Sequence, residues 1–104
     1  MRITRNTDAQ KLFELVVDWA NDKGLYDPKA QLNKVVEEVG EIAHEINRNR
    51  DGDELEDAIG DTMVTLIILA YLTGNNPTRC LAQAYKQIRK RNGKIVDGCF
   101  VREE

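Results

Sequence analysis

Ten of the 18 acidic residues of this 104-residue sequence lie between positions 37 and 61. On a helix with 100° per residue, Glu38 and Glu41 share one stripe, and Asp57 and Asp61 are i,i+4 neighbours in the second acidic segment. Like charges at these spacings repel one another. Carboxylates beside an apolar core also raise each other's pKa unless a cation compensates them. A hard divalent cation prefers oxygen ligands, so the spacing predicts a metal site.

A basic segment near the C-terminus is the counterpart of this acidic stretch. A polyanion cannot bind among carboxylates unless metal ions bridge the two, while basic side chains hold its remaining oxygens. We therefore expect the two segments to bind a polyanion together. A solvated basic face is the alternative, and the scarcity of aromatic residues in the run disfavours nucleic acid as a partner. From Pro77 to Lys94 the chain has no acidic residue, and its basic residues are Arg79, Lys86, Arg89, Lys90, Arg91 and Lys94.

Two helices are predicted in the first half of the chain. Thr7 with Gln10 three residues later has the form of a capping box. The helix that follows is expected to end at Gly24. Asp27-Pro28 marks a second start, with aspartate as the N-cap and proline in the first turn. The apolar face of this second helix runs from Leu32 to Ile46, with the acidic stripe beside it.

Two more helices and a hairpin complete the predicted fold. The third helix is expected from about Asp53 to Thr73, and its apolar second half should be the most buried part of the chain. The fourth starts at Asn76-Pro77, and Asp97-Gly98 indicates a tight turn within a short hairpin. The predicted class is all-α, a four-helix bundle-like domain with a short C-terminal β-hairpin. Four apolar residues of the fourth helix are expected to face inward: Leu81, Ala84, Tyr85 and Ile88.

Length and composition set limits on the class of protein. We expect residues 1–104 to form a single domain, because the chain is too short to divide. The longest apolar run is far shorter than a membrane span, and we see no N-terminal signal of basic and apolar residues. Cys80 and Cys99 lack CxxC spacing and are expected to be free thiols in a reducing compartment. We therefore expect a cytoplasmic protein without a membrane partner.

The two acidic motifs resemble those of one enzyme family. The segment Lys34-Val-Val-Glu-Glu-Val-Gly-Glu41, followed by Glu56-Asp-Ala-Ile-Gly-Asp61 and an apolar helix, looks like the MazG-type nucleoside triphosphate pyrophosphohydrolases. The tail from Ala84 to Val101 is similar to the ending of short, phage-type MazG-like proteins. The resemblance implies a helical, homodimeric or homotetrameric hydrolase that cleaves nucleoside or deoxynucleoside triphosphates to monophosphate and pyrophosphate. It also implies Mg²⁺, with Mn²⁺ as an alternative, held by an ExxE motif and a later ExxD motif.

The metal ligands are carried over residue by residue. The ExxE motif corresponds to Glu38 and Glu41, and the final aspartate of ExxD to Asp61. The glutamate expected three residues before Asp61 is Ala58 in this chain. Asp57 lies one turn from Asp61 and is therefore the candidate for the fourth ligand.

The chemistry of the acidic cluster, together with the resemblance, suggests catalytic and substrate-binding roles. A carboxylate that does not bind metal, Glu37 or Glu45, is the candidate for accepting a proton from the attacking water. Gln87 stands where larger relatives carry a lysine, which leaves the phosphates to other basic residues. The expected catalytic residues are Glu37, Glu38 and Glu41. The expected substrate-binding residues are Lys34, Arg91 and Lys94.

Other interpretations stay open. Because Ala58 replaces a ligand, one alternative is a MazG-like module that binds nucleotide or metal without turnover. A second is a helical, oligomerising interaction protein whose charged stripes only set subunit pairing. Glu41 with His44 has a spacing used in di-iron bundles, but the chain has no other histidine. Trp19 and Phe13 are expected in the core rather than as platforms for a base.

Overall fold

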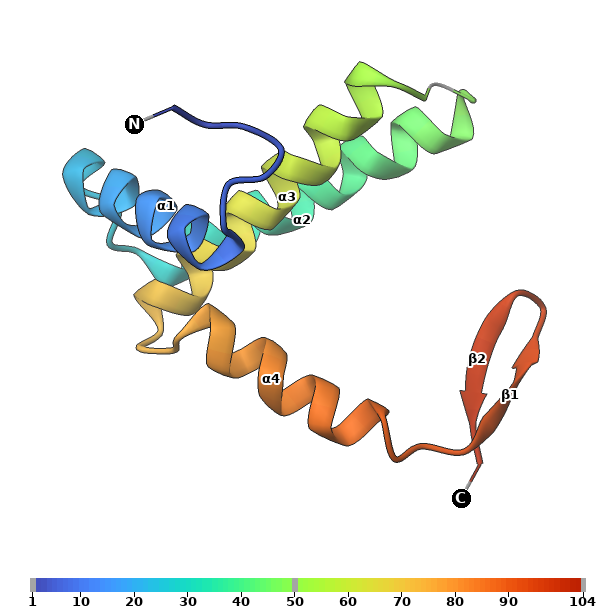
Figure 1. The fold of residues 1–104 in the computed structure, drawn as a ribbon. Helices are drawn as coiled ribbons and strands as arrows, with labels where there is room; N and C mark the ends of the chain where they lie inside the picture. The colour runs from blue at the N-terminus through green and yellow to red at the C-terminus, as the bar shows by residue number, and fades with distance from the viewer. Residues whose placement is uncertain (1, 50, 104) are drawn as a thin grey trace.

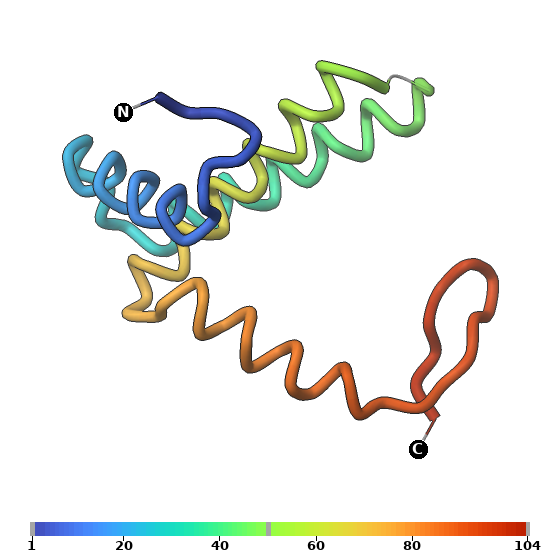
Figure 2. Tube along the Cα trace, viewed as in Figure 1, coloured from blue at the N-terminus to red at the C-terminus, as the bar shows by residue number. Residues whose placement is uncertain are grey.

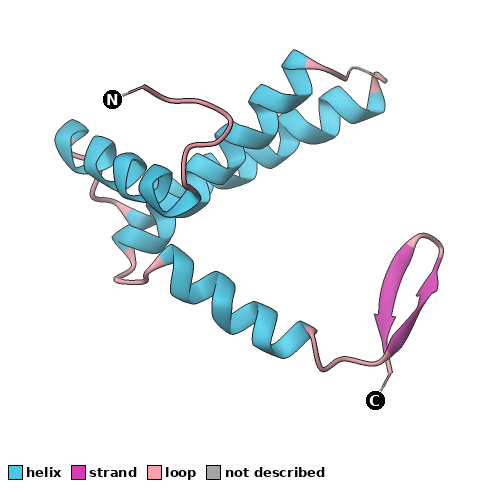
Figure 3. Ribbon diagram, viewed as in Figure 1, coloured by secondary structure: helices cyan, strands magenta, loops and turns pink. Residues whose placement is uncertain are grey.

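The computed structural model describes residues 2–49 and 51–103, and it confirms an all-α fold with a C-terminal hairpin (Figures 1 and 3). The helices and strands follow the predicted order along the chain. They are α1 (Ala9–Lys23), α2 (Pro28–Asn47), α3 (Asp53–Leu72), α4 (Pro77–Ile88), β1 (Gly93–Val96) and β2 (Cys99–Arg102).

The helix N-termini follow the sequence signals, with one correction. The side chains of Asp27 and Asn76 accept backbone N–H groups from the first turns of α2 and α4, as N-caps do. Helix α1 is capped by Asp8, whose carboxylate accepts a backbone N–H of the first turn at 3.2 Å. The hydroxyl of Thr7 instead accepts a backbone N–H of the preceding turn at 2.8 Å. The predicted capping box is therefore wrong, because Thr7 stabilises the turn before the helix.

Helices α2 and α3 form an antiparallel hairpin that is the body of the molecule (Figure 1). The α2 residues that face α3 recur at alternating spacings of four and three residues, as in a coiled-coil seam. The seam is small and polar, and the amide of Gln31 donates a hydrogen bond to the carbonyl of Thr65 across it at 3.1 Å. Its least exposed residues are Gln31, Val35, Glu38, Ile42 and Glu45 on α2, and Ala58, Thr62, Thr65 and Ile68 on α3.

This seam changes the interpretation of the apolar stripe of α2. Val36, Val39 and Ile46 point away from α3 and are half exposed or more, as is Leu32. The second half of α3 is likewise not uniformly buried, because Met63 and Leu66 are about half exposed. Hydrophobic periodicity correctly places the exposed apolar residues of α2 on one side of that helix. This side of α2, however, does not pack against α3.

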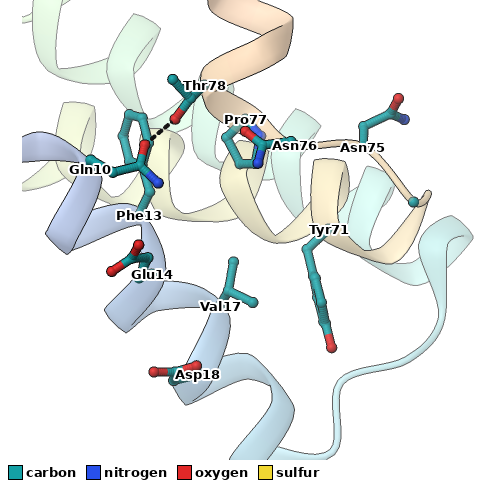
Figure 4. Close-up of a pocket in the computed structure, with 11 residues that line it drawn as sticks. Gln10, Phe13, Glu14, Val17, Asp18, Tyr71, Asn75, Asn76, Pro77 and Thr78 are labelled. Atoms are coloured by element: carbon teal, nitrogen blue, oxygen red, sulfur yellow. Dashed lines mark hydrogen bonds between the residues drawn. The ribbon is translucent and has the colours of Figure 1, made fainter.

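Helix α1 crosses the hairpin near the C-terminal end of α3. Ala20 is fully buried there, which allows the backbones to approach closely. At the other end of α1, the hydroxyl of Thr78 donates a hydrogen bond to the side-chain oxygen of Gln10 (Figure 4). The first turn of α4 is thereby joined to α1.

Helix α4 leaves the body of the molecule after its first turn (Figure 2). Within the described residues, neither α4 nor the two strands contain a buried side chain. The prediction that Leu81, Ala84, Tyr85 and Ile88 face inward is therefore wrong for a single chain, because all four are exposed and no element among the described residues buries them. We call residues 77–102 the C-terminal arm.

The hairpin at the end of the arm has the predicted turn. Ile95 pairs with Phe100, and Asp97 and Gly98 connect the strands with φ values of 51° and 80°. Two successive positive φ angles define the type I′ turn that suits a right-twisted hairpin. A Cβ at Gly93 would lie 2.6 Å from the ring of Phe100 and closer still to the backbone carbonyl oxygen of Val101, so only glycine fits here.

Candidate active site

A groove of about 770 Å³ lies where the end of α1 and the connection to α2 face the α2–α3 hairpin. It brings together the carboxylates of Glu38 and Asp61 from two helices, the N-cap carboxylate of Asp27, one ammonium group and two aromatic rings. We call it the acidic groove. Glu38 and Asp61, the predicted metal ligands among them, are called the groove carboxylates. Its lining residues are Trp19, Gly24, Leu25, Tyr26, Asp27, Ala30, Gln31, Lys34, Glu38, Asp61, Val64, Thr65, Ile68 and Leu72.

The antiparallel hairpin is what places Glu38 beside Asp61. Glu38 occupies a seam position between Val35 and Ile42, and its side chain is only 15% exposed. Asp61 precedes the buried Thr62 on the adjacent helix α3 and also lines the groove. A carboxylate with little exposure loses hydration, so a neighbouring cation stabilises its charged form. The two predicted ligands that flank the seam therefore share one groove.

Lys34 supplies a cation at this point of the groove. Its ammonium nitrogen lies 3.4 Å from carboxylate oxygens of both Glu37 and Glu38, one turn further along α2. The charge of Glu37 and the hydrogen bond to it, together with the nearby Glu38, raise the pKa of Lys34 above its usual value. Lys34 is therefore protonated at neutral pH and presents a positive charge beside Glu38 in the groove.

The other predicted acidic residues lie at the edge of this arrangement. Glu41 and Asp57 are exposed and lie one turn from Glu38 and Asp61, towards the turn that joins α2 and α3. Neither lines the groove. Among the residues that the structure describes, no three acidic, histidine or cysteine side chains are grouped closely enough to hold a metal ion. The structure thus brings together two of the four predicted metal ligands.

The chemistry of these donors fits magnesium. Mg²⁺ keeps several of its waters and is usually bound in proteins by one or two carboxylates together with substrate phosphates. Glu38 and Asp61 supply two carboxylates from the two helices that line the groove. Glu41 and Asp57 follow them on the same helix faces, at i,i+3 and i,i−4 spacing. The residues therefore suit a metal that arrives with a phosphate.

Two of the three predicted substrate-binding residues lie outside the groove. Arg91 follows α4 and Lys94 lies in β1, and both are exposed at the far end of the C-terminal arm. Because the arm leads away from the body, one chain does not bring them to Glu38 (Figure 2). Lys34 is the predicted phosphate contact that lines the groove.

The aromatic side of the groove is what sequence reasoning missed. Trp19 was expected in the core, but it is 52% exposed and lines the groove together with Tyr26, so the expectation of burial is wrong. A usable signal was present in the chain. Tyr26 immediately precedes Asp27, the N-cap of the helix that carries Glu38. The segment that connects α1 to α2, which contains Tyr26, must therefore lie at the N-terminal end of the helix with the acidic stripe.

The fold and the groove define an all-α domain in which a helical hairpin presents carboxylates beside an apolar, partly aromatic wall. Residues 27–95 match the model of the MazG nucleotide pyrophosphohydrolase domain, which covers more than half of the chain. The chain therefore belongs to this family.

A curated relative comes from a bacteriophage. The chain is 36% identical over 66 residues to an uncharacterized 18.2 kDa protein from the rep-hol intergenic region of Haemophilus phage HP1. The match covers 61% of this chain and 40% of that relative, so the chain corresponds to less than half of the phage protein. The similarity supports the resemblance to short, phage-type MazG-like proteins.

Proposed function

We propose that this chain is a Mg²⁺-dependent hydrolase that cleaves nucleoside or deoxynucleoside triphosphates to the monophosphate and pyrophosphate. The observation that carries the proposal is the meeting of Glu38, Asp61 and Lys34 in one groove of a chain from the MazG family. Mn²⁺ is an alternative to Mg²⁺, because the same oxygen ligands suit both ions.

The groove offers a separate place for each part of such a substrate. Its volume lies within the usual range for small-molecule sites. Trp19 and Tyr26 form an apolar end against which a nucleoside would lie, and Glu38 and Asp61 form the charged end for the phosphates. A bound divalent ion would neutralise phosphate charge and acidify a coordinated water. Glu37, which is exposed and lies next to Lys34, is the proposed acceptor of the water's proton.

A binding module without turnover is the second candidate, and one observation favours it. Ala58 is buried in the α2–α3 seam, so no carboxylate extends into the groove from that position. Its neighbour Asp57 is exposed and does not line the groove. A site with two groove carboxylates would hold a metal–nucleotide complex, but it has fewer groups with which to hold the attacking water.

The products of the reaction distinguish the two candidates. With Mg²⁺ and a set of nucleoside and deoxynucleoside triphosphates, we expect the monophosphate and pyrophosphate in equal amounts, resolved by anion-exchange chromatography. Cleavage between the α- and β-phosphates leaves no orthophosphate and no diphosphate. Diphosphates should be poorer substrates because they offer fewer charged oxygens to Lys34. Formation of nucleoside diphosphate and orthophosphate would show cleavage between the β- and γ-phosphates and would contradict the proposal. Nucleotide binding without any product would favour the binding module without turnover.

The cellular compartment and the oligomeric state of the enzyme are also part of the proposal. Among the described residues, no helix has both the length and the apolar character that a membrane span needs. Cys80 and Cys99 are exposed and not disulfide-bonded, which suits a reducing compartment. We propose a cytoplasmic enzyme that works as a homodimer or homotetramer.

Lys34→Met tests the charged end of the groove. Removal of one charge-assisted contact to phosphate costs about 1.5–3 kcal/mol, so we expect KM for the triphosphate to rise about tenfold or more. Helix content should not change, because Lys34 is half exposed and the pairs it makes with Glu37 and Glu38 are partly screened by water. Lys11→Met, which removes an exposed lysine of α1 outside the groove, is the control. Equal KM values for the two variants would remove Lys34 from the substrate site.

A further inference from the structure

A buried hydrogen bond crosses from α2 to α3 beside the acidic groove. Gln31 is 8% exposed, and its side-chain amide donates to the backbone carbonyl of Thr65 at 3.1 Å. Both residues line the groove. The bond lies one helical turn from Lys34 on α2 and one turn from Asp61 on α3. A contact between the two helices therefore lies next to the groups that the proposed reaction uses.

The threonine hydroxyls in this part of the seam bond within α3 instead. The hydroxyl of Thr62 donates to the carbonyl of Ala58 at 2.9 Å, and the hydroxyl of Thr65 donates to the carbonyl of Thr62 at 2.8 Å. Hydrogen bonds to the preceding turn of the same helix do not depend on where the neighbouring helix lies. The bond of Gln31 does depend on it, because its donor and its acceptor belong to different helices.

The apolar contacts of the seam fix the register of the two helices less sharply than this bond. Val35 and Ile42 contribute apolar surface to the seam, but apolar burial has no preferred direction. A hydrogen bond weakens steeply when its distance or angle changes. In coiled coils, a single polar residue at a seam position selects one register at a cost in stability. Gln31 occupies such a position, four residues before Val35.

The turn that connects α2 to α3 lies far from the two groove carboxylates. Glu38 lies about two and a half helical turns before the end of α2 at Asn47, at 3.6 residues per turn. Asp61 lies about two turns after the start of α3 at Asp53. A slide of one helix along the other by a full turn would shift one carboxylate by about 5.4 Å. A misplacement of only about 1 Å can slow a reaction about 100-fold, so the spacing of the carboxylates needs a contact beyond the turn.

We propose that Gln31 is a positioning residue, which fixes the register of α2 against α3 and thereby holds Glu38 and Asp61 at the spacing that a metal–phosphate complex requires. Gln31 acts through the two carboxylates rather than through a contact with the substrate. Its effect on turnover rests on the proposed function, whereas the register is a property of the hairpin without any ligand.

Gln31→Met separates positioning from packing. Methionine is unbranched like glutamine and cannot donate a hydrogen bond, and the carbonyl of Thr65 keeps its bond within α3. We expect kcat for pyrophosphate release to fall about tenfold or more, because the carboxylates are no longer held at one spacing. KM should stay within about threefold, because Lys34 still contacts the phosphates. The melting temperature should stay within about 5 °C of the wild type, because apolar burial offsets the lost bond.

Thr62→Val is the matched control. It also removes a buried polar group from the seam, but the hydrogen bond that is lost lies within α3, and Thr62 does not line the groove. We therefore expect the kcat of the wild type. Wild-type kcat in Gln31→Met, or an equal loss of kcat in the two variants, would remove Gln31 from the positioning role.

A distance measurement tests the register without turnover. Spin labels are attached at Lys29→Cys and Glu54→Cys, two exposed positions near opposite ends of the hairpin, in a chain with Cys80→Ser and Cys99→Ser. Pulsed electron paramagnetic resonance, with the labelled chain diluted in unlabelled chain, gives the distance within one chain. We expect one narrow distribution when Gln31 is intact and a broader or shifted one in Gln31→Met.

The two measurements together distinguish the possible failures. Identical distance distributions with and without Gln31 would overturn the proposal even if kcat falls, because the residue would then act through packing alone. A changed distribution in Gln31→Met, in a protein whose wild type releases no pyrophosphate, would support the register role and contradict the proposed function.

Discussion

Glu38→Gln and Asp61→Asn should each lower kcat/KM for pyrophosphate release by at least about 100-fold. Each change keeps the size of the side chain and removes the negative charge that would bind the metal–phosphate complex. Glu38 is 15% exposed beside Lys34, so the glutamine fits the same space in the seam. Steady-state rates from a coupled pyrophosphate assay, with circular dichroism of each variant, separate loss of chemistry from loss of fold.

The metal itself provides a second measurement of the same prediction. Mg²⁺ should raise the melting temperature of the wild type by mass action, but not that of Glu38→Gln or Asp61→Asn. Glu54→Gln is the matched control, because Glu54 is an exposed carboxylate in the first turn of α3 outside the groove. An Asp61→Asn enzyme with wild-type turnover would show that the assigned groove is not the active site.

Asp57→Asn decides how many carboxylates the site needs. The structure places Asp57 one turn from Asp61 and outside the groove, with Ala58 buried beside it. If Mg²⁺ is held by the two groove carboxylates and phosphate, the loss should be less than about tenfold. A loss as large as that of Asp61→Asn would mean that Asp57 turns towards the metal in the loaded enzyme.

The helices themselves were predictable because their signals are local. Asp27-Pro28 and Asn76-Pro77 start α2 and α4 where capping chemistry requires, and Asp97-Gly98 makes the hairpin turn. The face that each helix buries was not predictable from the same signals. On α2 the hydrophobic positions Val36 and Val39 remain exposed, because hydrophobic periodicity identifies an apolar side but not which neighbour covers it.

The candidate site was predictable to the extent that it depends on spacing along two helices. Glu38 and Asp61 meet because an antiparallel hairpin brings positions near the middle of each helix together. The aromatic wall depends on the path of the connection that contains Tyr26, and its position is tertiary information. The expected roles of Arg91 and Lys94 depend on where the C-terminal arm goes, which local sequence does not determine.

Ile68→Ala should produce the largest loss of stability among single truncations in the body, about 2–4 kcal/mol. Ile68 is 2% exposed and is the largest fully buried side chain among the described residues. Apart from Val35 and Ile42, the other residues of the seam are small or polar. Few other apolar groups are present to compensate, so the cavity left by the truncation should collapse poorly. The melting temperature should fall by roughly 10–25 °C in calorimetry at fixed protein concentration.

Two control variants test whether the loss of stability in Ile68→Ala comes from the buried position of Ile68 rather than from the loss of an isoleucine side chain as such. Ile68→Val removes one methylene and should cost only about 0.5–1.5 kcal/mol. Ile95→Ala makes the same truncation as Ile68→Ala at a hairpin residue that is 69% exposed, so its cost should stay near 0.5 kcal/mol. If Ile68→Ala and Ile95→Ala lowered the melting temperature equally, the seam between α2 and α3 would not be the core of the protein.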